Sequence, residues 1–458
     1  MKHFKRILQT LLFLVSFQNL FSQNSISRAK AFEDIDYYNK MISEVHLNPL
    51  VNKDQKDYLL QVETLKQRVK DSLSPEDFII LLYKLSGFLE DTHSSPCGSQ
   101  PILSEELKKE QFFPYALIID KHNLYVPKTS ASAWGIPIGA HIISINSVLM
   151  SRMVPEMERY YGGRSSFSTD IAQKLFCYFL FLNAIKAPFE IDYTDVSGKS
   201  IHTTITSGLS FKRAIQASLP NYESNWDFKI VENKLAYFNF RSMSGDLEVF
   251  NKFIDSCITV TKSNNIQDIA IDVRENGGGN SQFGDVFLSY LTTKKYSLMG
   301  GRQWKVSALY KDYLRSKGDT LHTYLGKANG SIWELGDCNP RENDFKSKNL
   351  FAGNVYLLTG AFTFSSANMF SDGIKNYKLA TVVGEPTGEN TNDFGEVYDF
   401  VLPNSKIRMQ TTTSFDFGTD CNKNSRTPVL PDKLIENNLN TKLYARDLAL
   451  EYILGQIK

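Results

Sequence analysis

The chain has 458 residues with 42% hydrophobic side chains, which is enough to bury two or three cores. Its 51 basic and 50 acidic residues leave a formal net charge of +1. This balance gives no electrostatic basis for binding nucleic acid or an acidic membrane surface, so we expect neither partner.

The N-terminus has the layout of a signal peptide. A basic segment at residues 1–6 precedes an apolar run at residues 7–17, and a polar stretch begins at Ser22. The apolar run is too short to span a bilayer comfortably, and no later run is long enough. We therefore predict a signal peptide over residues 1–22, export to the periplasm or the cell exterior, and no stable membrane span after cleavage. A retained membrane anchor is the alternative interpretation.

A small helical cap is predicted over residues 23–95. Apolar residues recur at helical spacing in two stretches, which is typical of helices that pack into a core. The two faces consist of Phe32, Ile35, Tyr38, Met41, Ile42 and Val45, and of Phe78, Ile79, Leu82, Leu85 and Leu89. His93 follows the second face, and it alone among the seven histidines has such neighbours. A histidine at a helix end is commonly a cap or a solvated group, but it also has the chemistry of a general base.

Residues 105–207 alternate short strand patterns with turns. The predicted strands lie at 115–119, 123–126, 139–146, 189–193 and 201–205. An aromatic-rich segment at residues 153–185 interrupts them, and its rings are expected to lie in a core rather than on a binding face. These rings belong to Tyr160, Tyr161, Phe176, Tyr178, Phe179 and Phe181.

From residue 220 to residue 458, strand and helix patterns alternate, which indicates an α/β core. Strands are predicted at 235–240, 269–273, 355–359 and 379–383. One helix is predicted at 246–263, a second continues past Gly284, and a third starts at Ser366. Folds of this kind place functional loops at the C-terminal ends of their strands. An insertion at residues 297–348 carries several Trp and Tyr residues that either line a substrate groove or simply pack, and the sequence does not decide between the two.

The best candidate nucleophile is Ser365. It lies between an apolar strand pattern that ends at Gly360 and an amphipathic helical pattern that starts at Ser366. A serine in such a turn has its hydroxyl in solvent, and the N–H of the next residue points out of the helix N-terminus, where it can receive an oxyanion. The alternative is that Ser365 serves only as the N-cap of the helix.

Three consecutive glycines, Gly277, Gly278 and Gly279, follow the buried strand pattern at residues 269–273. Glycine permits positive φ and close approach of the backbone to another group, so one of these amides is a candidate second oxyanion donor. A phosphate cradle is disfavoured here, because these glycines are not followed by Lys-Ser/Thr and do not have dinucleotide glycine spacing.

The five cysteines are an odd number for an exported chain. Cys177 and Cys257 lie in apolar periodic segments and are interpreted as small core residues. Cys97, Cys338 and Cys421 lie in polar loops, and any two of them can form a disulfide in an oxidising compartment. We expect no metal, because neither Cys-x-x-Cys nor paired histidines occur.

Together these segments resemble the tail-specific, or C-terminal processing, serine peptidases, and within them the branch of the tricorn core and the retinoid-binding-protein repeats. The resemblance covers most of the mature chain. It rests on three motifs in the family's order: an Asp-Val-Arg-x-Asn-Gly-Gly-Gly segment from Asp272, a Thr-Phe-Ser-Ser-Ala turn at 363–367, and a strand and loop at 380–388.

The resemblance implies a fold and a substrate class. It implies an α/β fold, with a crotonase-like serine peptidase core over residues 220–458, the N-terminal helical cap, and an inserted PDZ-like β-rich domain over residues 105–207. The stretch at residues 135–146 in particular resembles a PDZ domain. Such a domain can bind an extended polypeptide, often by its C-terminal carboxylate, as an added strand.

The resemblance also implies roles for single residues. Ser365 is the expected nucleophile and His93 the expected general base. The amide of Ser366 and one amide from Gly277, Gly278 and Gly279 are expected to form the oxyanion hole. Thr92 falls where the tricorn-like enzymes carry a serine that supports the histidine.

Two departures from the family pattern concern the base and the acid. The Ser–Lys branch carries a lysine after its Gly-Glu-x-Thr-x-Gly segment, but Glu389 follows that segment here, so a lysine base is not expected. The tricorn-like branch carries a glutamate shortly before a Gly-Val-x-Pro-Asp element, and Ser425 stands about there. The acid is thus unassigned, with Asp416, Asp420 and Glu396 as unranked substitutes.

The sequence therefore predicts an exported serine endopeptidase that cleaves polypeptides through an acyl-serine intermediate without a cofactor. The alternative is a noncatalytic ligand- or peptide-binding protein, because retinoid-binding repeats carry this fold without needing peptidase activity. An esterase is disfavoured, because no Gly-x-Ser-x-Gly elbow is present.

Overall fold

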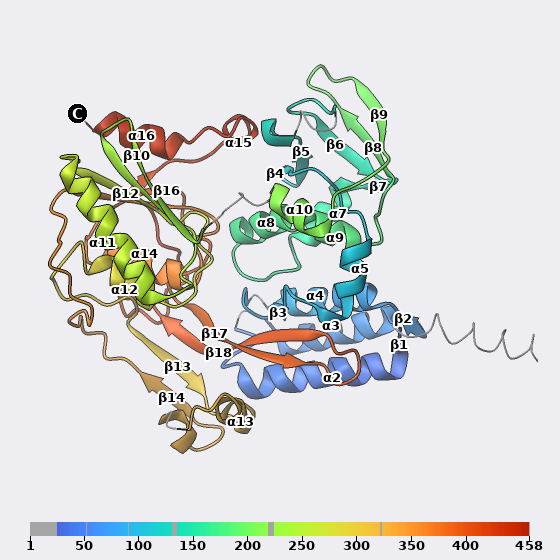
Figure 1. Cartoon of the computed structure of the whole chain (residues 1–458). Helices are drawn as coiled ribbons and strands as arrows, with labels where there is room; N and C mark the ends of the chain where they lie inside the picture. The colour runs from blue at the N-terminus through green and yellow to red at the C-terminus, as the bar shows by residue number, and fades with distance from the viewer. Residues whose placement is uncertain are drawn as a thin grey trace, which may run out of the picture.

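The computed structural model describes residues 25–51, 53–89, 91–130, 135–218, 224–320 and 323–457. The predicted signal peptide lies outside these ranges. The described chain is a mixed α/β protein with a helical N-terminal part, a β-rich insert and an α/β core (Figure 1). Within these ranges, no helix combines the length and the apolar character needed to cross a membrane.

The N-terminal part, blue in Figure 1, consists of three helices and a short strand pair. The elements are β1 (Ile26–Ser27), α2 (Arg28–Val45), α3 (Gln55–Arg68), β2 (Ser72–Leu73) and α4 (Pro75–Ser86). Helix α4 begins where Pro75 occupies the first turn and the Ser74 hydroxyl accepts the Asp77 N–H. The predicted apolar faces are buried, except for the partly buried Phe32. The 3-10 turn η1 (Gly87–Leu89) then leads to His93.

The insert is an antiparallel sheet in the order β4-β5-β6-β8-β9, with β7 beside β6, and helices pack on it. Its strands are β4 (Ile118–Asp120), β5 (Asn123–Tyr125), β6 (His141–Ile145), β7 (Val148–Leu149), β8 (Phe189–Thr194) and β9 (Ser200–Ile205). Its helices are α7 (Met150–Met157), α8 (Ser165–Lys174), α9 (Phe176–Leu182) and α10 (Phe211–Ser218), and α5 (Ser104–Lys109) precedes the sheet. The aromatic rings predicted to lie in a core do so, and Tyr161 is partly buried.

The core sheet has the order β10-β11-β12-β15-β16-β19, parallel except for β10. Its strands are β10 (Trp226–Val231), β11 (Leu235–Phe240), β12 (Asp268–Asp272), β15 (Asn354–Thr359), β16 (Thr381–Gly384) and β19 (Lys433–Leu434). Helices α11 (Leu247–Ser263), α12 (Gln282–Leu288) and α14 (Ser366–Asn376) cover one face, and α16 (Leu448–Gln456) covers the other. This placement explains why the central strand β12 is buried along its whole length.

A second antiparallel sheet, which the sequence patterns did not predict, joins the core to the N-terminal part. Its order is β14-β13-β18-β17, and β3 pairs with β18. The strands are β3 (Ser95–Pro96), β13 (Gly301–Lys305), β14 (Ile332–Leu335), β17 (Asp393–Val401) and β18 (Arg408–Phe417). The hairpin β17–β18 extends from the core across α2 (Figure 1).

The insertion at residues 297–348, which contains α13 (Ala308–Ser316), packs against that hairpin. Trp304, Tyr310, Tyr324 and Trp333 are buried in one cluster together with hairpin aromatics. Its aromatic rings therefore pack rather than line a groove. One disulfide joins Cys338 to Cys421, while Cys97, Cys177 and Cys257 are buried as free thiols.

Candidate active site

Ser365 occupies a strained turn between β15 and α14. Its φ of 55° and ψ of −127° are rare for a residue with a side chain, and such strain is common at functional sites. The Thr363 hydroxyl braces the turn, because it accepts the Gly360 N–H at 3.0 Å and donates to the Val273 carbonyl at 2.8 Å. The Ser365 side chain makes no capping hydrogen bond to α14, so its hydroxyl is not engaged as an N-cap.

The glycine turn after β12 packs directly against the nucleophile turn. Gly278 has a φ of 93°, which favours glycine. A Cβ atom at Gly278 would lie 2.7 Å from Cβ of Ser365 and 2.8 Å from the backbone nitrogen of Ser366. The Ser366 hydroxyl also donates to the Gly279 carbonyl at 2.6 Å. The close contact between the two turns therefore depends on glycine.

The three glycine amides are not equivalent. The Gly278 N–H donates to the Asn276 side chain at 2.8 Å, and this side chain donates in turn to the Phe240 carbonyl at 2.7 Å. Gly277 and Gly279 line the cavity at Ser365. The Gly278 amide therefore shapes the turn. The amides of Gly277, Gly279 and Ser366, at the start of α14, remain available to donate to an oxyanion.

His93 lies in a buried turn, and its backbone is held on both sides. Its N–H donates to Oδ1 of Asp91 at 2.9 Å, and its carbonyl accepts the Gln410 side-chain amide of β18 at 2.9 Å. Burial lowers the pKa of the imidazole, and the negative charges of Asp91 and Asp416 oppose this only in part. The imidazole is therefore neutral at neutral pH, as a general base must be.

Three rings in contact connect the insert to the base. The His93 ring lies 4.5 Å from the Phe364 ring, and Phe364 lies 4.4 Å from Phe167 of α8 at an interplanar angle of 19°. Phe364 immediately precedes Ser365. The insert thus contributes packing to the nucleophile turn, and not only a separate surface.

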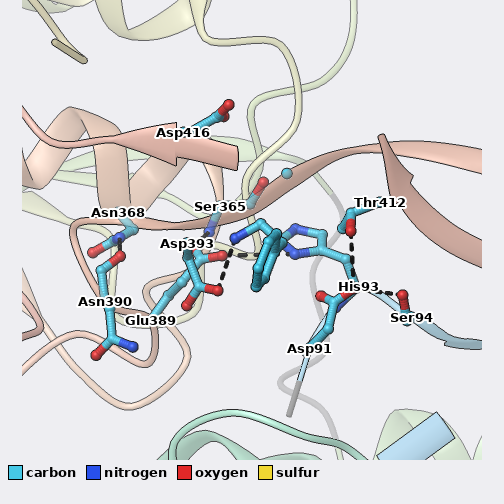
Figure 2. Close-up of polar contacts among 12 residues, drawn as sticks. Asp91, His93, Ser94, Ser365, Asn368, Glu389, Asn390, Asp393, Thr412 and Asp416 are labelled. Carbon is cyan, nitrogen blue, oxygen red and sulfur yellow. Dashed lines mark hydrogen bonds and ion pairs between the residues drawn. The ribbon is translucent and has the colours of Figure 1, made fainter. Parts of the chain in front are cut away.

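Glu389 is the acidic residue that contacts the histidine, and sequence reasoning did not select it. Its Oε1 lies 3.6 Å from Nδ1 of His93, and its Oε2 accepts the Ser365 N–H at 2.6 Å (Figure 2). Burial raises the pKa of this carboxyl well above its ordinary value, and Asp393 adds to the effect. The signal was present in the sequence, because Glu389 stands directly after the Gly-Glu-x-Thr-x-Gly segment.

The three acids considered from the sequence are placed differently. Asp416 and Glu396 line the cavity, but both face Arg302, at 2.6 Å and 3.6 Å. Asp420 is exposed and accepts the backbone N–H of Asn422. None of the three contacts the His93 ring.

The two residues expected to support the histidine do not reach it with their hydroxyl groups. The Thr92 hydroxyl is buried without a hydrogen-bond partner, and the Ser425 hydroxyl pairs with Thr427 at 3.0 Å. Lys375, on the helix after the nucleophile, pairs with Asp432 instead of turning toward Ser365. The structure thus brings Ser365, His93 and the glycine turn together, but not Thr92 or Ser425.

The candidate catalytic groups lie at one cavity of about 550 Å³. It is lined by Ser365, His93, Glu389, Gly277 and Gly279, and by Met299 and Arg302 of the insertion. No hydrogen bond joins the Ser365 and His93 side chains, and catalytic pairs often tighten only when substrate binds. Among the residues that the structure describes, no group of His, Cys, Asp and Glu side chains is arranged to hold a metal ion.

The comparisons with known proteins give one matching family model and several solved structures of similar fold. Residues 234–432 match the model of peptidase family S41. The fold is similar to that of mature CPAF complexed with lactacystin, with 15% identity, a TM-score of 0.64, and coverage of 94% of this chain and 97% of that chain. Another structure of mature CPAF is similar with 15% identity, a TM-score of 0.62, and coverage of 93% of this chain and 96% of that chain. The photosystem II D1 C-terminal processing protease has 11% identity, a TM-score of 0.44, and coverage of 89% of this chain and 93% of that chain. No curated protein matches this chain.

Proposed function

We propose that the chain is a serine-type peptidase of family S41, whose model matches residues 234–432, and that it cleaves internal peptide bonds of polypeptides with Ser365 as nucleophile, His93 as base and Glu389 as acid. The observation that carries the proposal is the convergence of these side chains and the glycine turn on one cavity. They come from separate segments of the chain, so their meeting is a property of the fold.

The reaction follows from what each group can do. A serine hydroxyl is a poor nucleophile at neutral pH, so His93 must take its proton as Oγ of Ser365 attacks the peptide carbonyl carbon. The imidazolium then gives that proton to the leaving amine nitrogen. Water attacks the acyl-serine in a second step and regenerates the hydroxyl. The negative oxygen formed in each step is stabilised by the Ser366 N–H and by an N–H of Gly277 or Gly279.

Glu389 links the nucleophile to the base. One carboxyl oxygen lies 3.6 Å from Nδ1 of His93, just beyond hydrogen-bond distance. We infer that it accepts the proton of Nδ1 when bound substrate tightens the site, so that Nε2 accepts the proton of Ser365. The other oxygen accepts the Ser365 N–H and holds the strained turn. Once His93 is protonated, the carboxylate stabilises its positive charge.

The pKa shifts give the direction of the pH dependence. Burial raises the pKa of Glu389 and lowers that of His93, so Glu389 keeps its proton to a higher pH than an exposed carboxyl does. The active form requires an ionised carboxylate. Activity therefore rises with pH as Glu389 loses its proton.

The architecture supports finer assignments within the same proposal. The parallel sheet covered on both faces supports a crotonase-like core over residues 220–458, and the antiparallel sheet with its helices supports a PDZ-like domain over residues 105–207. Residues 23–95 form the helical cap. The use of a histidine base supports the tricorn-like branch. The PDZ-like domain presents polypeptide substrates by their C-termini, which binding of peptides with free and amidated C-termini would test.

Export is part of the proposal. The Cys338–Cys421 disulfide supports a periplasmic or extracellular location, because such bonds persist in oxidising compartments. Fractionation of cells and N-terminal sequencing of the mature protein would test this location and the removal of residues 1–22.

A fluorophosphonate probe tests the catalytic assignment. The wild-type protein should be labelled on Ser365, as located by mass spectrometry, and should cleave an unfolded polypeptide, whereas Ser365→Ala should do neither. An unlabelled and inactive wild-type protein would instead support the noncatalytic binding protein.

A further inference from the structure

A buried polar network behind His93 has no role in the mechanism above. Its centre is Asp91, which is 1% exposed. Its Oδ2 faces Nε2 of His46 at 3.1 Å and accepts the Thr412 hydroxyl at 3.0 Å, and the Ser94 hydroxyl donates to the same oxygen. Its Oδ1 accepts the backbone N–H of His93. Figure 2 shows Ser94 and Thr412 on the side of His93 opposite Ser365.

His46 is fully buried at the C-terminal end of α2. Its Nδ1 accepts the Asn48 N–H at 3.1 Å, which places the ring proton on Nε2, the nitrogen that faces Asp91. Its ring lies 4.3 Å from that of Phe394, close to the active-site cavity. The end of α2 is thus connected to the turn of the catalytic base by one directed hydrogen bond.

We propose that His46 and Asp91 are positioning residues for the base: His46 orients the Asp91 carboxylate, which holds the His93 backbone. The inference rests on the proposed function of His93. The His93 backbone is held by Asp91 on one side and by Gln410 on the other, so a shift of Asp91 displaces the backbone that carries the imidazole. A displacement of about 1 Å can cost roughly 100-fold in rate.

The charge of Asp91 gives the proposal a second, electrostatic consequence. The other charged or titratable groups around His93 are Glu389, Asp393, Asp416 with its partner Arg302, and His46 behind Asp91. The charge of Asp91 raises the pKa of His93 and that of Glu389 alike. Its removal should therefore move the acid limb of kcat/KM to lower pH, whichever of the two groups sets it.

The test compares His46→Leu, His46→Gln and Asp91→Asn, with the exposed His202→Gln as control. His46→Leu should lower kcat about 10–100-fold with KM nearly unchanged, as loss of an orienting partner does. The labelling rate of Ser365 by a fluorophosphonate should fall by the same factor. His46→Gln keeps a donor for Asp91 and should retain most of the rate. Asp91→Asn should lower kcat and shift the acid limb to lower pH.

Unchanged kcat in His46→Leu overturns the proposal. So does an equal loss in His46→Gln and His46→Leu that follows their melting temperatures, because the histidine would then matter only for packing. If Asp91→Asn does not fold, the comparison of His46→Leu with His46→Gln still tests the proposal. If the probe does not label the wild-type protein, the proposed function itself is refuted. If the probe labels the wild type and all the His46 variants at the same rate, only the positioning role is refuted.

Discussion

The two halves of the active site are built in different ways. The nucleophile half consists of two turns that follow neighbouring parallel strands, β12 and β15, and these turns touch through Gly278. The base half is assembled from the end of α2, the turn at His93, the loop after β16 and strand β18. The nucleophile half thus depends on local backbone geometry, whereas the base half depends on contacts between distant segments. Substitutions should therefore act on the two halves through different physical causes.

The largest effect is expected where the halves meet. Ser365→Ala and His93→Ala should each lower kcat by about 10⁴–10⁶-fold, and the double variant should be little worse than either, because the two groups act as a unit. Single-turnover kinetics on a labelled polypeptide would measure this. Full activity in either single variant would rule out the assignment.

Glu389→Gln removes the charge that joins the halves while nearly conserving shape. We expect kcat to fall by about 10²–10⁴-fold, because the imidazole loses the partner that fixes its tautomer and stabilises its charge. In the wild type, the raised pKa of Glu389 sets the acid limb of kcat/KM. In the variant, the lowered pKa of His93 sets it, so the limb should move to lower pH.

Glu396→Gln is the matched control for that experiment. Glu396 lines the same cavity, but its partners are Arg302, the Trp304 indole N–H and the Thr413 hydroxyl, at 3.6 Å, 2.6 Å and 2.8 Å. The acid limb should stay in place in this variant. A shift as large as that of Glu389→Gln would mean that the carboxylates of the cavity act together and not through a specific contact with His93.

Gly278→Ala tests the nucleophile half alone. The added methyl group would meet Ser365 and the Ser366 nitrogen below 3 Å, so the turns must separate and the oxyanion donors must move. Loss of one such donor costs about 10²–10³-fold in kcat, and we expect an effect of that order. At Gly277 a Cβ would only touch the Phe362 ring at 3.3 Å, so Gly277→Ala should be milder. Equal losses in both variants would argue against the close contact of the turns.

The same contrast separates what the sequence could predict from what it could not. The predicted strand at 235–240 coincides with β11, and a helix does begin at Ser366, because such patterns are local. The hairpin β17–β18 was missed. Residues 410–414 are polar yet largely buried, since their side chains bond to distant groups such as Asp91 and Glu396. Hydropathy alternation cannot reveal a strand of this kind.

The acid was missed for a related reason. Spacing along the chain directed attention to residues near Ser425 and to Asp416, but the contact with His93 depends on how the loop after β16 folds back onto the nucleophile turn. In this loop a Cβ at Gly388 would lie 2.0 Å from the Ala361 carbonyl oxygen, so the backbone runs directly against that turn. Such packing between remote segments leaves no periodic signal in the sequence.

The smallest effects are expected from the two hydroxyl residues that family resemblance placed near the base. Thr92→Val keeps the shape and removes only a hydroxyl that has no hydrogen-bond partner, while Ser425→Ala removes one that pairs with the nearby Thr427. Neither hydroxyl contacts His93, so each variant should keep kcat within about threefold, and Thr92→Val should not lower the melting temperature, because a buried unpaired hydroxyl contributes no net stability. Lys375→Met should be equally mild, since its ammonium pairs with Asp432 outside the cavity. A loss of 100-fold or more in Thr92→Val, with the fold intact by circular dichroism, would mean that the Thr92 hydroxyl turns toward His93 when substrate binds, and that the base half rearranges during catalysis.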